Sequence, residues 1–330
     1  PGPACYGRGG TEATVTDASV VLGYLNPDYF AGGAISLDAE RAFNVIEKTV
    51  AQPLGFSVER AAQGIHRVVN AQMAEGIRLV SIRRGFDPRR FALIPLGGAG
   101  PVHATALADE LGITKIIVPR NPGVLSAAGL LMAPIEHEAV TSVQRNLAGL
   151  SPSDLLPTLR DLDAQCQGLM AAEGVATTGT VVRHLADVCY IGQSYHLEVP
   201  LYIDDAKPLE RLHQDFRREH DRVHGHATDG PAKIVNLRSV HTLGGDGVLG
   251  DGDQKRAGGD SLKGERSVLF VDADTPQMAV IHERDRLAVG ARVIGPAIIE
   301  QADTTTVVTQ GWQAIVHILG NLVIEKQKSP

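Results

Sequence analysis

The sequence predicts an α/β fold whose carboxy-terminal part is an α+β region with a small sheet or barrel. Apolar residues recur at three- and four-residue steps through residues 36–85, as in amphipathic helices. Residues 91–120 then follow the order strand, glycine turn, helix and strand, which is a βαβ unit. Short β-branched runs alternate with glycine turns over residues 266–325. The pattern of the sequence changes after Pro134, and we therefore expect two domains in the 330 residues, 1–138 and 139–330.

The individual elements follow from caps, periodicity and turn residues. A short helix is expected from a capped start at Thr16 or Asp17, and Gly85 with Pro88 ends the helical region. Later patterns predict, in order, a helix over 151–175, two strands around Gly192 over 181–201, a helix over 208–225 and a strand over 232–243. Residues 244–265 are so rich in Gly, Asp and Lys that we expect a mobile surface loop there.

Composition excludes several classes of function. The formal net charge of −7 comes without a Lys/Arg block, and a nucleic-acid partner is disfavoured because phosphate contacts need clustered cations. No apolar run reaches the roughly 20 residues of a membrane helix, so we expect neither a span nor a signal peptide. Cys5, Cys166 and Cys189 lie far apart without CxxC spacing, which favours a reducing compartment and, by default, the cytoplasm.

Gly97, Gly98 and Gly100 lie where the predicted strand feeds the predicted helix. Backbone N–H groups and the helix dipole can hold an anion at such a place, and glycine permits close approach of a ligand. A Rossmann fingerprint beginning at Gly98 is a near miss, because His103 stands at the third glycine position and Arg120 stands where an NAD site needs an acid. A tight turn without any ligand is the other interpretation.

Long, ordered motifs carry a resemblance that spans nearly the whole chain. The stretches are "PGPACYGRGG", "TVTDA", "RRGFDPRRFALIPLGGAGPVHA", "VPRNPGVLSAAGLL", "YIGQSYHLEVPL", "IVNLRS" and "GPAIIEQADTTTVV". They resemble the hydantoinase A / 5-oxoprolinase family, which includes the beta-type subunit of acetone carboxylase. This family is similar to the actin, sugar kinase and heat-shock chaperone ATPases, whose two lobes close on ATP.

The resemblance implies how the two domains divide. Residues 1–138 resemble a portion of the second lobe of an actin-like ATPase domain, and residues 139–330 resemble the carboxy-terminal α+β domain of the family. The turn at residues 97–100 is then similar to the adenosine-side glycine motif of the second lobe. In the family, the acidic phosphate-binding segments lie upstream of "PGPACYGRGG". The chain therefore resembles the carboxy-terminal half of a longer subunit, with Pro1 at a cut.

The resemblance also implies an activity. Family members open amide-like rings or carboxylate ketones at the expense of ATP, which brings Mg²⁺ on its phosphates. We therefore expect a hydrolase or carboxylase subunit that activates a carbonyl by phosphorylation, acts on a small cyclic amide or ketone, and assembles with a hydantoinase B-type subunit into an oligomer. We expect the chain alone to be inactive. A non-catalytic assembly module and an NADP-binding Rossmann oxidoreductase are the alternatives.

The opening loop and the glycine turn supply the candidate nucleotide-binding residues. By the resemblance, the loop is a wall of the cleft in which Gly9 and Gly10 give backbone freedom and Arg8 grips phosphate or carboxylate. A structural bond from Arg8 to loop carbonyls is the alternative. Asp17 is either a helix N-cap or an orienting carboxylate beside the cleft.

His103, in the first helical turn, is expected to be neutral and either to hydrogen-bond a ligand oxygen or to cap a neighbour's carbonyl. Asn70 and Arg78 face the same side of a helix and could border an adenine pocket, although Arg78 is better explained as a solvated residue.

The remaining candidates favour structural roles. Cys5 is better explained as a packed thiol than as a nucleophile, because the sequence shows no base beside it. A cluster of histidines has spacings a metal can use, but surface or core roles are favoured and no metal ligand is assigned; its members are His213, His220, His224 and His226. The role of residues 303–308, "DTTTVV", stays open between a family motif and an ordinary strand. No catalytic residue is assigned.

Overall fold

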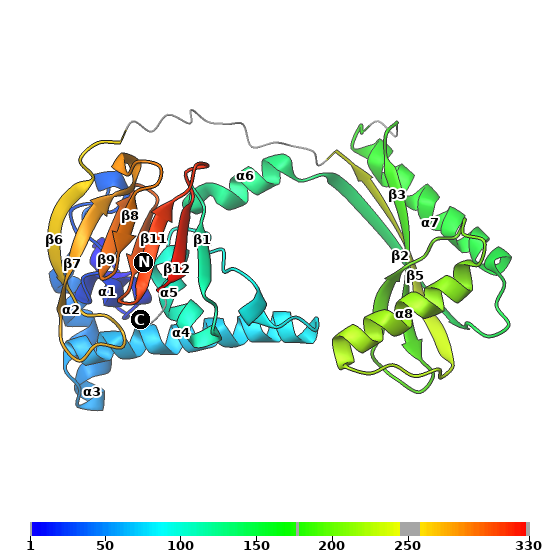
Figure 1. Cartoon of the computed structure of the whole chain (residues 1–330), viewed down its shortest axis with the longest axis horizontal. Coiled ribbons are helices and arrows are strands. Elements are labelled where there is room, and N and C mark those ends of the chain that lie inside the picture. Colours follow the sequence, from blue (N-terminus) through cyan, green and yellow to red (C-terminus); the bar gives the residue numbers. More distant parts are fainter. Residues whose placement is uncertain (1, 176–177, 245–257, 328–330) are drawn as a thin grey trace. The chain divides into compact units, whose positions relative to one another are not determined.

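The computed structural model describes residues 2–175, 178–244 and 258–327, and the chain divides into two compact units. Unit 1 contains Pro1–Gly129 and Gly250–Pro330, and unit 2 contains Leu130–Leu249. Each unit carries both helices and sheets (Figure 1), so the expected mixed α/β class is confirmed. The observed division differs from a single boundary at residue 139, because the last strands of the chain pair with a strand of the amino-terminal segment.

The helices of unit 1 come almost entirely from its first segment. They are α1 (Val15–Val21), α2 (Ala39–Ile46), α3 (Gln52–Leu54), α4 (Val58–Arg83) and α5 (Gly100–Leu111). A π-helical stretch at Glu47–Ala51 joins α2 to α3. Single helical turns lie at Ala4–Tyr6, Ala31–Gly33, Pro88–Arg90, Pro122–Val124 and Arg284–Arg286. Helix α6 (Leu125–Met132) contains the point at which the units divide. As predicted, the long helix ends before Gly85 and Pro88.

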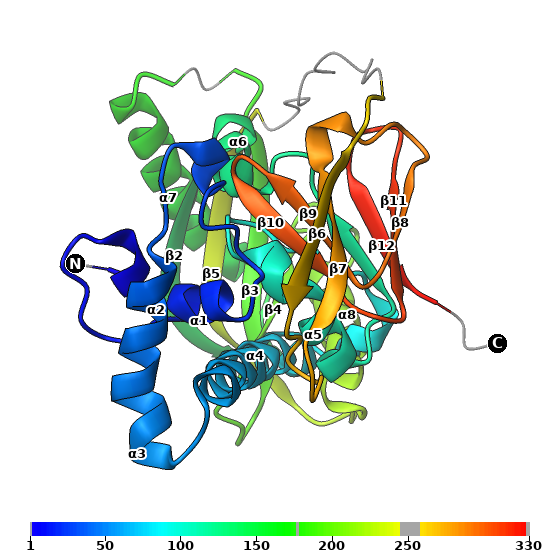
Figure 2. The same cartoon turned by 90° about the vertical axis from the view of Figure 1, so that its left-hand side faces the viewer.

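The strands of unit 1 form two four-stranded sheets (Figure 2). One sheet has the order β1 (Lys115–Val118), β12 (Leu322–Lys326), β11 (Trp312–Val316) and β8 (Arg292–Ile294), and all its pairs are antiparallel. The other has the order β10 (Thr304–Val308), β9 (Ala297–Gln301), β7 (Gln277–Glu283) and β6 (Leu262–Val268), with β7 and β9 parallel.

The predicted βαβ unit is present in a reduced form. Its first strand is a single parallel bridge between Leu93 and Ile116, and α5 and β1 follow as expected. Strand β1 then pairs antiparallel with β12. A Rossmann fold requires a parallel sheet beside its glycine turn, so the Rossmann oxidoreductase interpretation is wrong.

The opening loop is fastened to α1 by one carboxylate. Thr14, rather than Thr16 or Asp17, is the N-cap of α1, and Asp17 completes its capping box at the third helical position. The Asp17 carboxylate accepts hydrogen bonds from the main-chain N–H groups of Cys5 (2.8 Å) and Ala4 (3.3 Å), and from the Thr14 hydroxyl (2.6 Å). Since Asp17 is fully buried, these bonds fix the loop against the helix.

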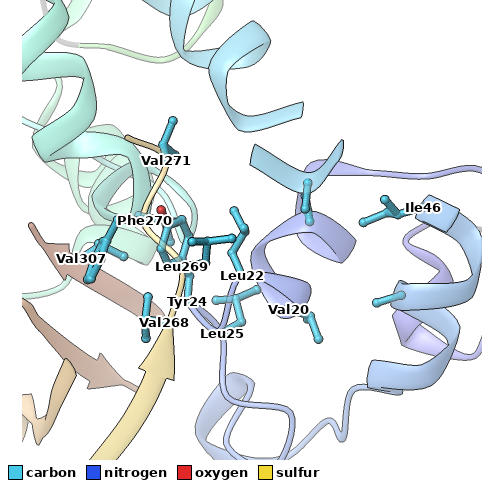
Figure 3. Close-up of a cluster of buried hydrophobic side chains, with 14 of the residues drawn as sticks. Val20, Leu22, Tyr24, Leu25, Ile46, Val268, Leu269, Phe270, Val271 and Val307 are labelled. Carbon is cyan, nitrogen blue, oxygen red and sulfur yellow. The ribbon is translucent and has the colours of Figure 1, made fainter. Parts of the chain in front are cut away.

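Two hydrophobic clusters form the core of unit 1. One joins α1, α2 and α4 to the end of β6 and the segment that follows it, where Val268, Leu269 and Phe270 pack against Leu22 and Tyr24 (Figure 3). The other joins α5 and β1 to the carboxy-terminal strands around Trp312, which is fully buried. In both clusters, residues more than 200 positions apart in the sequence exclude water together.

Unit 2 is a four-stranded antiparallel sheet with two helices. The strands lie in the order β2 (Ile135–Asn146), β5 (Ala232–Leu243), β3 (Val181–Tyr190) and β4 (Leu197–Pro200), and the helices are α7 (Pro152–Ala172) and α8 (Pro208–His224). Both helices, β3, β4 and β5 agree with the sequence prediction. Strand β2 was not predicted. Strand β6 begins at Leu262, inside the predicted surface loop, and residues 245–257 of that loop lie outside the described residues.

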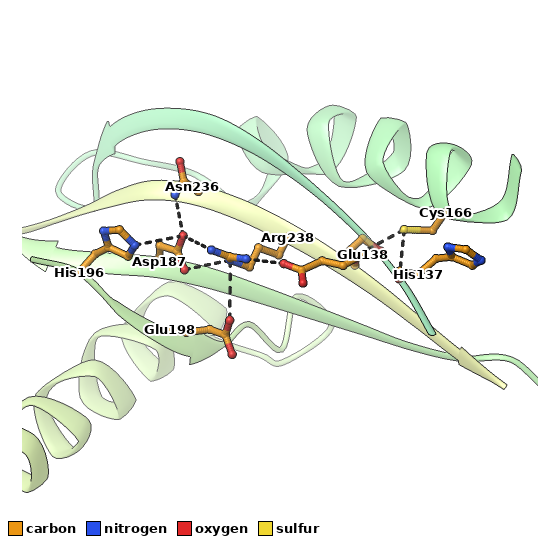
Figure 4. Close-up of polar contacts among 9 residues, drawn as sticks. His137, Glu138, Cys166, Asp187, His196, Glu198, Asn236 and Arg238 are labelled. Atoms are coloured by element: carbon orange, nitrogen blue, oxygen red, sulfur yellow. Dashed lines mark hydrogen bonds and ion pairs between the residues drawn. The ribbon is translucent and has the colours of Figure 1, made fainter. Parts of the chain in front are cut away.

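A polar network ties the strands of unit 2 together (Figure 4). Asp187 of β3 pairs with Arg238 of β5 at 2.9 Å, and Arg238 also pairs with Glu138 of β2 and Glu198 of β4. Burial opposes charge on Asp187, but hydrogen bonds from Arg238 and Asn236 lower the pKa of its carboxyl. Because Asp187 lies between two core residues of β3, the network occupies the sheet face opposite the apolar core.

Candidate functional site

A cleft of about 350 Å³ lies in unit 1, where segments from both ends of the described chain meet. Its walls come from α1, from the loop after α1, from the start of α5, and from the connection between β9 and β10. The lining residues are Tyr6, Val15, Thr16, Ser19, Leu25, Tyr29, Phe30, Ala31, Gly98, Ala99, Val102, His103, Gln301, Ala302, Asp303, Thr304 and Thr305.

The glycine turn faces this cleft and is held from both sides. Gly97 has a φ of +79°, which favours glycine, and its N–H donates to the Pro122 carbonyl at 2.8 Å. The Thr304 hydroxyl donates to the Gly98 carbonyl at 2.8 Å. A Cβ at Gly98 would lie 3.1 Å from the main-chain oxygen of Asp303. A side chain at position 98 would therefore crowd the narrow space between the turn and the β9–β10 connection.

The cleft carries little charge. Asp303 is its one charged lining residue among those described, and the Asp303 carboxylate already accepts the Gly123 N–H at 2.9 Å. Burial, followed by a hydrogen bond to Glu283, raises the pKa of Tyr29 to about 12, so its phenol stays protonated. The rings of Tyr6 and Phe30 lie 5.7 Å apart on the wall. Walls with aromatic surface, no Lys or Arg and a single carboxylate suit the neutral, planar part of a ligand better than its phosphates.

A buried polar cluster lies behind the cleft. His103 Nδ1 lies 2.7 Å from Asn70 Oδ1, His66 Nε2 lies 2.9 Å from the Ser19 hydroxyl, and the two imidazoles stack at 4.9 Å between centroids. Burial lowers the pKa of His103 to about 4, and burial together with His103 lowers that of His66 to about 3. The expected neutrality of His103 agrees with this geometry, and the carbonyl that it contacts belongs to the side chain of Asn70.

A second cavity of about 190 Å³ adjoins the polar cluster. His66 and Asn70 line it, while Ser19 and His103 line the cleft, and Val102 lines both spaces. Asn70 therefore does not line the cleft, whereas a residue that borders an adenine pocket there would have to line it. The Asn70 side chain contacts His103, which does line the cleft.

The other predicted site residues divide between the cleft and its supports. Gly98 and His103 line the cleft, whereas Gly97 and Gly100 shape the turn without appearing on the wall. Arg8 and Gly9 are exposed and do not line the cleft, and a Cβ at Gly10 would collide with the main chain of Gly2 and Pro3. The expected wall formed by Arg8, Gly9 and Gly10 is therefore not part of this cleft, because the loop folds back on itself and presents Tyr6 instead. Asp17 fastens that loop from behind.

Residues 301–305 form the wall that sequence reasoning missed. Gln301, Ala302, Asp303, Thr304 and Thr305 all line the cleft. The threonine run does form an ordinary strand, β10, but its first residues also face the ligand space. The available signal was the family-like stretch "GPAIIEQADTTTVV", whose position beside the glycine turn only the fold reveals.

The remaining candidates have structural roles. Burial, with a contribution from Asp17, raises the pKa of the Cys5 thiol to about 12, so it is not a thiolate nucleophile. Arg78 joins α4 to α5 by donating to the Glu110 carbonyl at 2.8 Å. The ring of His220 packs 4.5 Å from that of His224, and its Nδ1 pairs with the main-chain oxygen of His226.

The described residues contain neither a cluster of metal ligands nor a membrane-spanning helix. Across residues 2–175, 178–244 and 258–327, no group of three or more His, Cys, Asp or Glu side chains is arranged to hold a metal ion. Within the same part of the chain, every helix is too short or too polar to cross a bilayer.

The fold and the cleft define an α/β protein with a cleft beside a glycine turn. The family model described as hydantoinase/oxoprolinase matches residues 1–139, and the model of the hydantoinase/oxoprolinase C-terminal domain matches residues 250–319. The chain belongs to the hydantoinase/oxoprolinase family.

Relatives within this family cover nearly the whole chain. The caprolactamase subunit alpha of Pseudomonas jessenii is 34% identical over 321 residues, which make up 95% of this chain and 46% of that subunit. The acetone carboxylase beta subunit of Xanthobacter autotrophicus is 29% identical over 331 residues, which make up 94% of this chain and 45% of that subunit. The chain therefore spans less than half the length of these relatives.

A solved structure shares the fold. The crystal structure of the ATP-dependent caprolactamase from Pseudomonas jessenii matches with a TM-score of 0.82 at 32% sequence identity. The match covers 99% of this chain and 49% of that one. The fold of both units is thus that of a known ATP-dependent enzyme.

The neutral histidines predict a pH dependence. Unfolded His66 and His103 take up protons below their ordinary pKa of about 6.5, whereas the folded rings do so only near 3 and 4. Their contribution to stability is therefore present above about pH 6.5 and is lost as the pH falls, by at most about 1.4 kcal/mol per pH unit for each ring. In an NMR titration from pH 8 to pH 5, the signals of His66 and His103 should not shift, and each signal is assigned by its loss in the matching variant, His66→Gln or His103→Gln. Titration of all rings near pH 6.5 would contradict the buried cluster.

Proposed function

We propose that the chain is part of an ATP-dependent amidohydrolase or ketone carboxylase subunit, and that the unit 1 cleft holds the nucleoside part of ATP. The observation that carries the proposal is the glycine turn at the start of α5, which opens on a cleft with aromatic walls and a single charged residue, Asp303, in its described lining. The family supports it, since the relatives include an ATP-dependent caprolactamase. The amino-terminal segment of unit 1 then corresponds to a portion of the second lobe of an actin-like ATPase.

The chemistry explains the need for ATP. An amide is a poor electrophile because its nitrogen donates electron density to the carbonyl. Phosphorylation of the carbonyl oxygen makes the carbonyl carbon more electrophilic. Such catalysis depends on groups placed around the transferred phosphate. The described lining of the cleft has no Lys or Arg, so we assign it the nucleoside and assign the phosphates to residues elsewhere in the complete subunit.

Magnesium does not fit the described residues as a resident ion. They offer no group of three acidic or histidine ligands, and the Asp303 carboxylate is already paired. We therefore propose Mg²⁺ only as the ion that accompanies the phosphates, and no residue of this chain is assigned to it.

The substrate and the partner are proposed from the relatives' names. A caprolactamase subunit alpha and an acetone carboxylase beta subunit both point to a carbonyl compound, either a cyclic amide or a small ketone. Both relatives are named as subunits, which supports a heteromeric complex, with a hydantoinase B-type chain as the proposed partner. The three buried, unpaired cysteines favour a reducing compartment such as the cytoplasm.

Gly98→Ala tests the nucleotide site. The new methyl group would enter the cleft wall and lie 3.1 Å from the Asp303 oxygen, so we expect ATP affinity to fall at least about tenfold, or about 1.4 kcal/mol. Isothermal titration with ATP measures the change, and circular dichroism checks the fold. Gly76→Ala is the matched control, since Gly76 is exposed in the middle of α4 with nothing within 4 Å of its added Cβ. Equal ATP affinity in all three folded proteins would refute the proposed site.

A measurement of turnover distinguishes whether this chain is a complete enzyme or only a part of one. We expect the purified 330-residue chain to release no phosphate from ATP with hydantoins, 5-oxoproline, caprolactam or small ketones, because the described cleft lacks cations for the transferred phosphate. A phosphate-release assay of the chain by itself, run beside a complete family enzyme as the positive control, makes the measurement. ATP-dependent turnover by the chain alone would show that its own residues carry the catalytic machinery.

A further inference from the structure

The chemistry of one histidine nitrogen identifies the part of the ligand that the cleft recognises. His103 and Asn70 are 5% and 7% exposed, and His103 Nδ1 lies 2.7 Å from Asn70 Oδ1. An amide oxygen only accepts hydrogen bonds, so the imidazole proton lies on Nδ1 and donates to Asn70. The neutral ring has a single N–H, and therefore Nε2 carries a lone pair.

The lone pair of His103 has no protein partner among the described residues. The hydrogen bond to Asn70 is the one that the His103 ring makes there. Nε2 is also not one of the enclosed polar atoms that lack a partner, so it is accessible from outside. His103 lines the cleft, whereas Asn70 lines the second cavity behind it. The side of the ring that faces away from Asn70, which carries Nε2, therefore faces the cleft.

The surroundings keep the ring in this state. His103 lies in the first turn of α5, where the helix dipole disfavours an imidazolium, and it stacks on His66, which is itself buried. The Ser19 hydroxyl pairs with His66 at 2.9 Å, so His66 is held in place beneath His103. A fixed, neutral ring presents the same acceptor to every ligand that enters.

We propose that His103, held in its Nδ1–H tautomer by Asn70, uses Nε2 to accept a hydrogen bond from an uncharged N–H or O–H group of the bound nucleoside. This proposal rests on the proposed nucleotide site. It gives a direction to the expected hydrogen bond between His103 and a ligand: the ring accepts, because its only proton is already used. In ATP the uncharged donors are the 6-amino group of adenine and the ribose hydroxyls. Asn70 is thereby a positioning residue, which acts on the ligand through His103.

The test compares ATP with three analogues that each lack one donor: purine riboside triphosphate, which lacks the 6-amino group, 2′-deoxy-ATP and 3′-deoxy-ATP. A site whose acceptor loses its partner discriminates strongly. We therefore expect one analogue to bind the unmodified chain about tenfold or more weakly than ATP, and that analogue identifies the donor. In His103→Phe the same analogue and ATP should bind equally, while His317→Phe, an exposed control, should keep the discrimination.

A spectroscopic measurement tests the role of Asn70 independently of affinity. The ¹⁵N signals of His103 should show a protonated Nδ1 and an unprotonated Nε2, and Asn70→Leu should move the proton toward Nε2. Asn70→Leu should also reduce the discrimination between ATP and the sensitive analogue. A His103 proton on Nε2 in the unmodified chain would overturn the proposal.

The outcomes separate this inference from the proposed function. ATP binding with no loss for any of the three analogues, or discrimination that persists in folded His103→Phe, overturns the role of His103 and leaves the nucleotide site standing. Failure of the unmodified chain to bind ATP overturns the proposed function and this inference with it. Because the analogue series needs only the unmodified chain, it decides the matter even if His103→Phe does not fold.

Discussion

The contact between the glycine turn and the β9–β10 connection is the constraint on which the site depends. The Thr304 hydroxyl donates to the Gly98 carbonyl, and the Asp303 carboxylate accepts the Gly123 N–H. The Thr105 hydroxyl continues this contact along β10 by donating to the Val307 carbonyl at 3.3 Å. These bonds join segments about 200 residues apart, and the ladder between β1 and β12 supports them. Without this closure, the turn would face solvent and there would be no cleft.

Packing of these distant segments against each other also sets the charge state of the residues around the cleft. Helices α4 and α5 and the segment after β6 bury His66, His103 and Asn70 so deeply that both imidazoles stay neutral. Because Asp303 is the one charged residue in its described lining, the cleft can distinguish ligands mainly by hydrogen-bond direction and shape. Under the proposed function, this chain recognises the nucleoside, and other segments of the complete subunit neutralise the phosphates. That division agrees with a chain spanning less than half the length of its relatives.

Periodicity and caps predicted most of the helices and the strands around Gly192, because those signals act within a few residues. Strand β2 escaped prediction because its residues, "IEHEAVTSVQRN", are largely polar and mostly exposed, so they show no clear alternation. The N-cap of α1 was misplaced by two or three residues, since three neighbouring polar residues can each cap a helix and Thr14 has the extended backbone that a cap needs. The return of the carboxy-terminal strands to β1 has no local signature at all.

The candidate site was predictable only where its chemistry is local. The glycine turn and the neutral His103 follow from a strand-to-helix junction and a helix dipole. The partner of His103 does not, because Asn70 lies 33 positions away on another helix. Arg8 is predicted to bind phosphate because it is a cation in a glycine-rich loop. Asp17 fastens that loop, however, so that Tyr6, rather than Arg8, lines the cleft.

The most direct test of the central claim is a crystal structure of this chain grown with a non-hydrolysable ATP analogue. We expect density for the nucleoside between the glycine turn and residues 301–305, with a base nitrogen or ribose oxygen within hydrogen-bond distance of His103 Nε2. The phosphates should extend away from the described walls of the cleft. An empty cleft beside a nucleotide bound elsewhere in unit 1, or anywhere in unit 2, would contradict it.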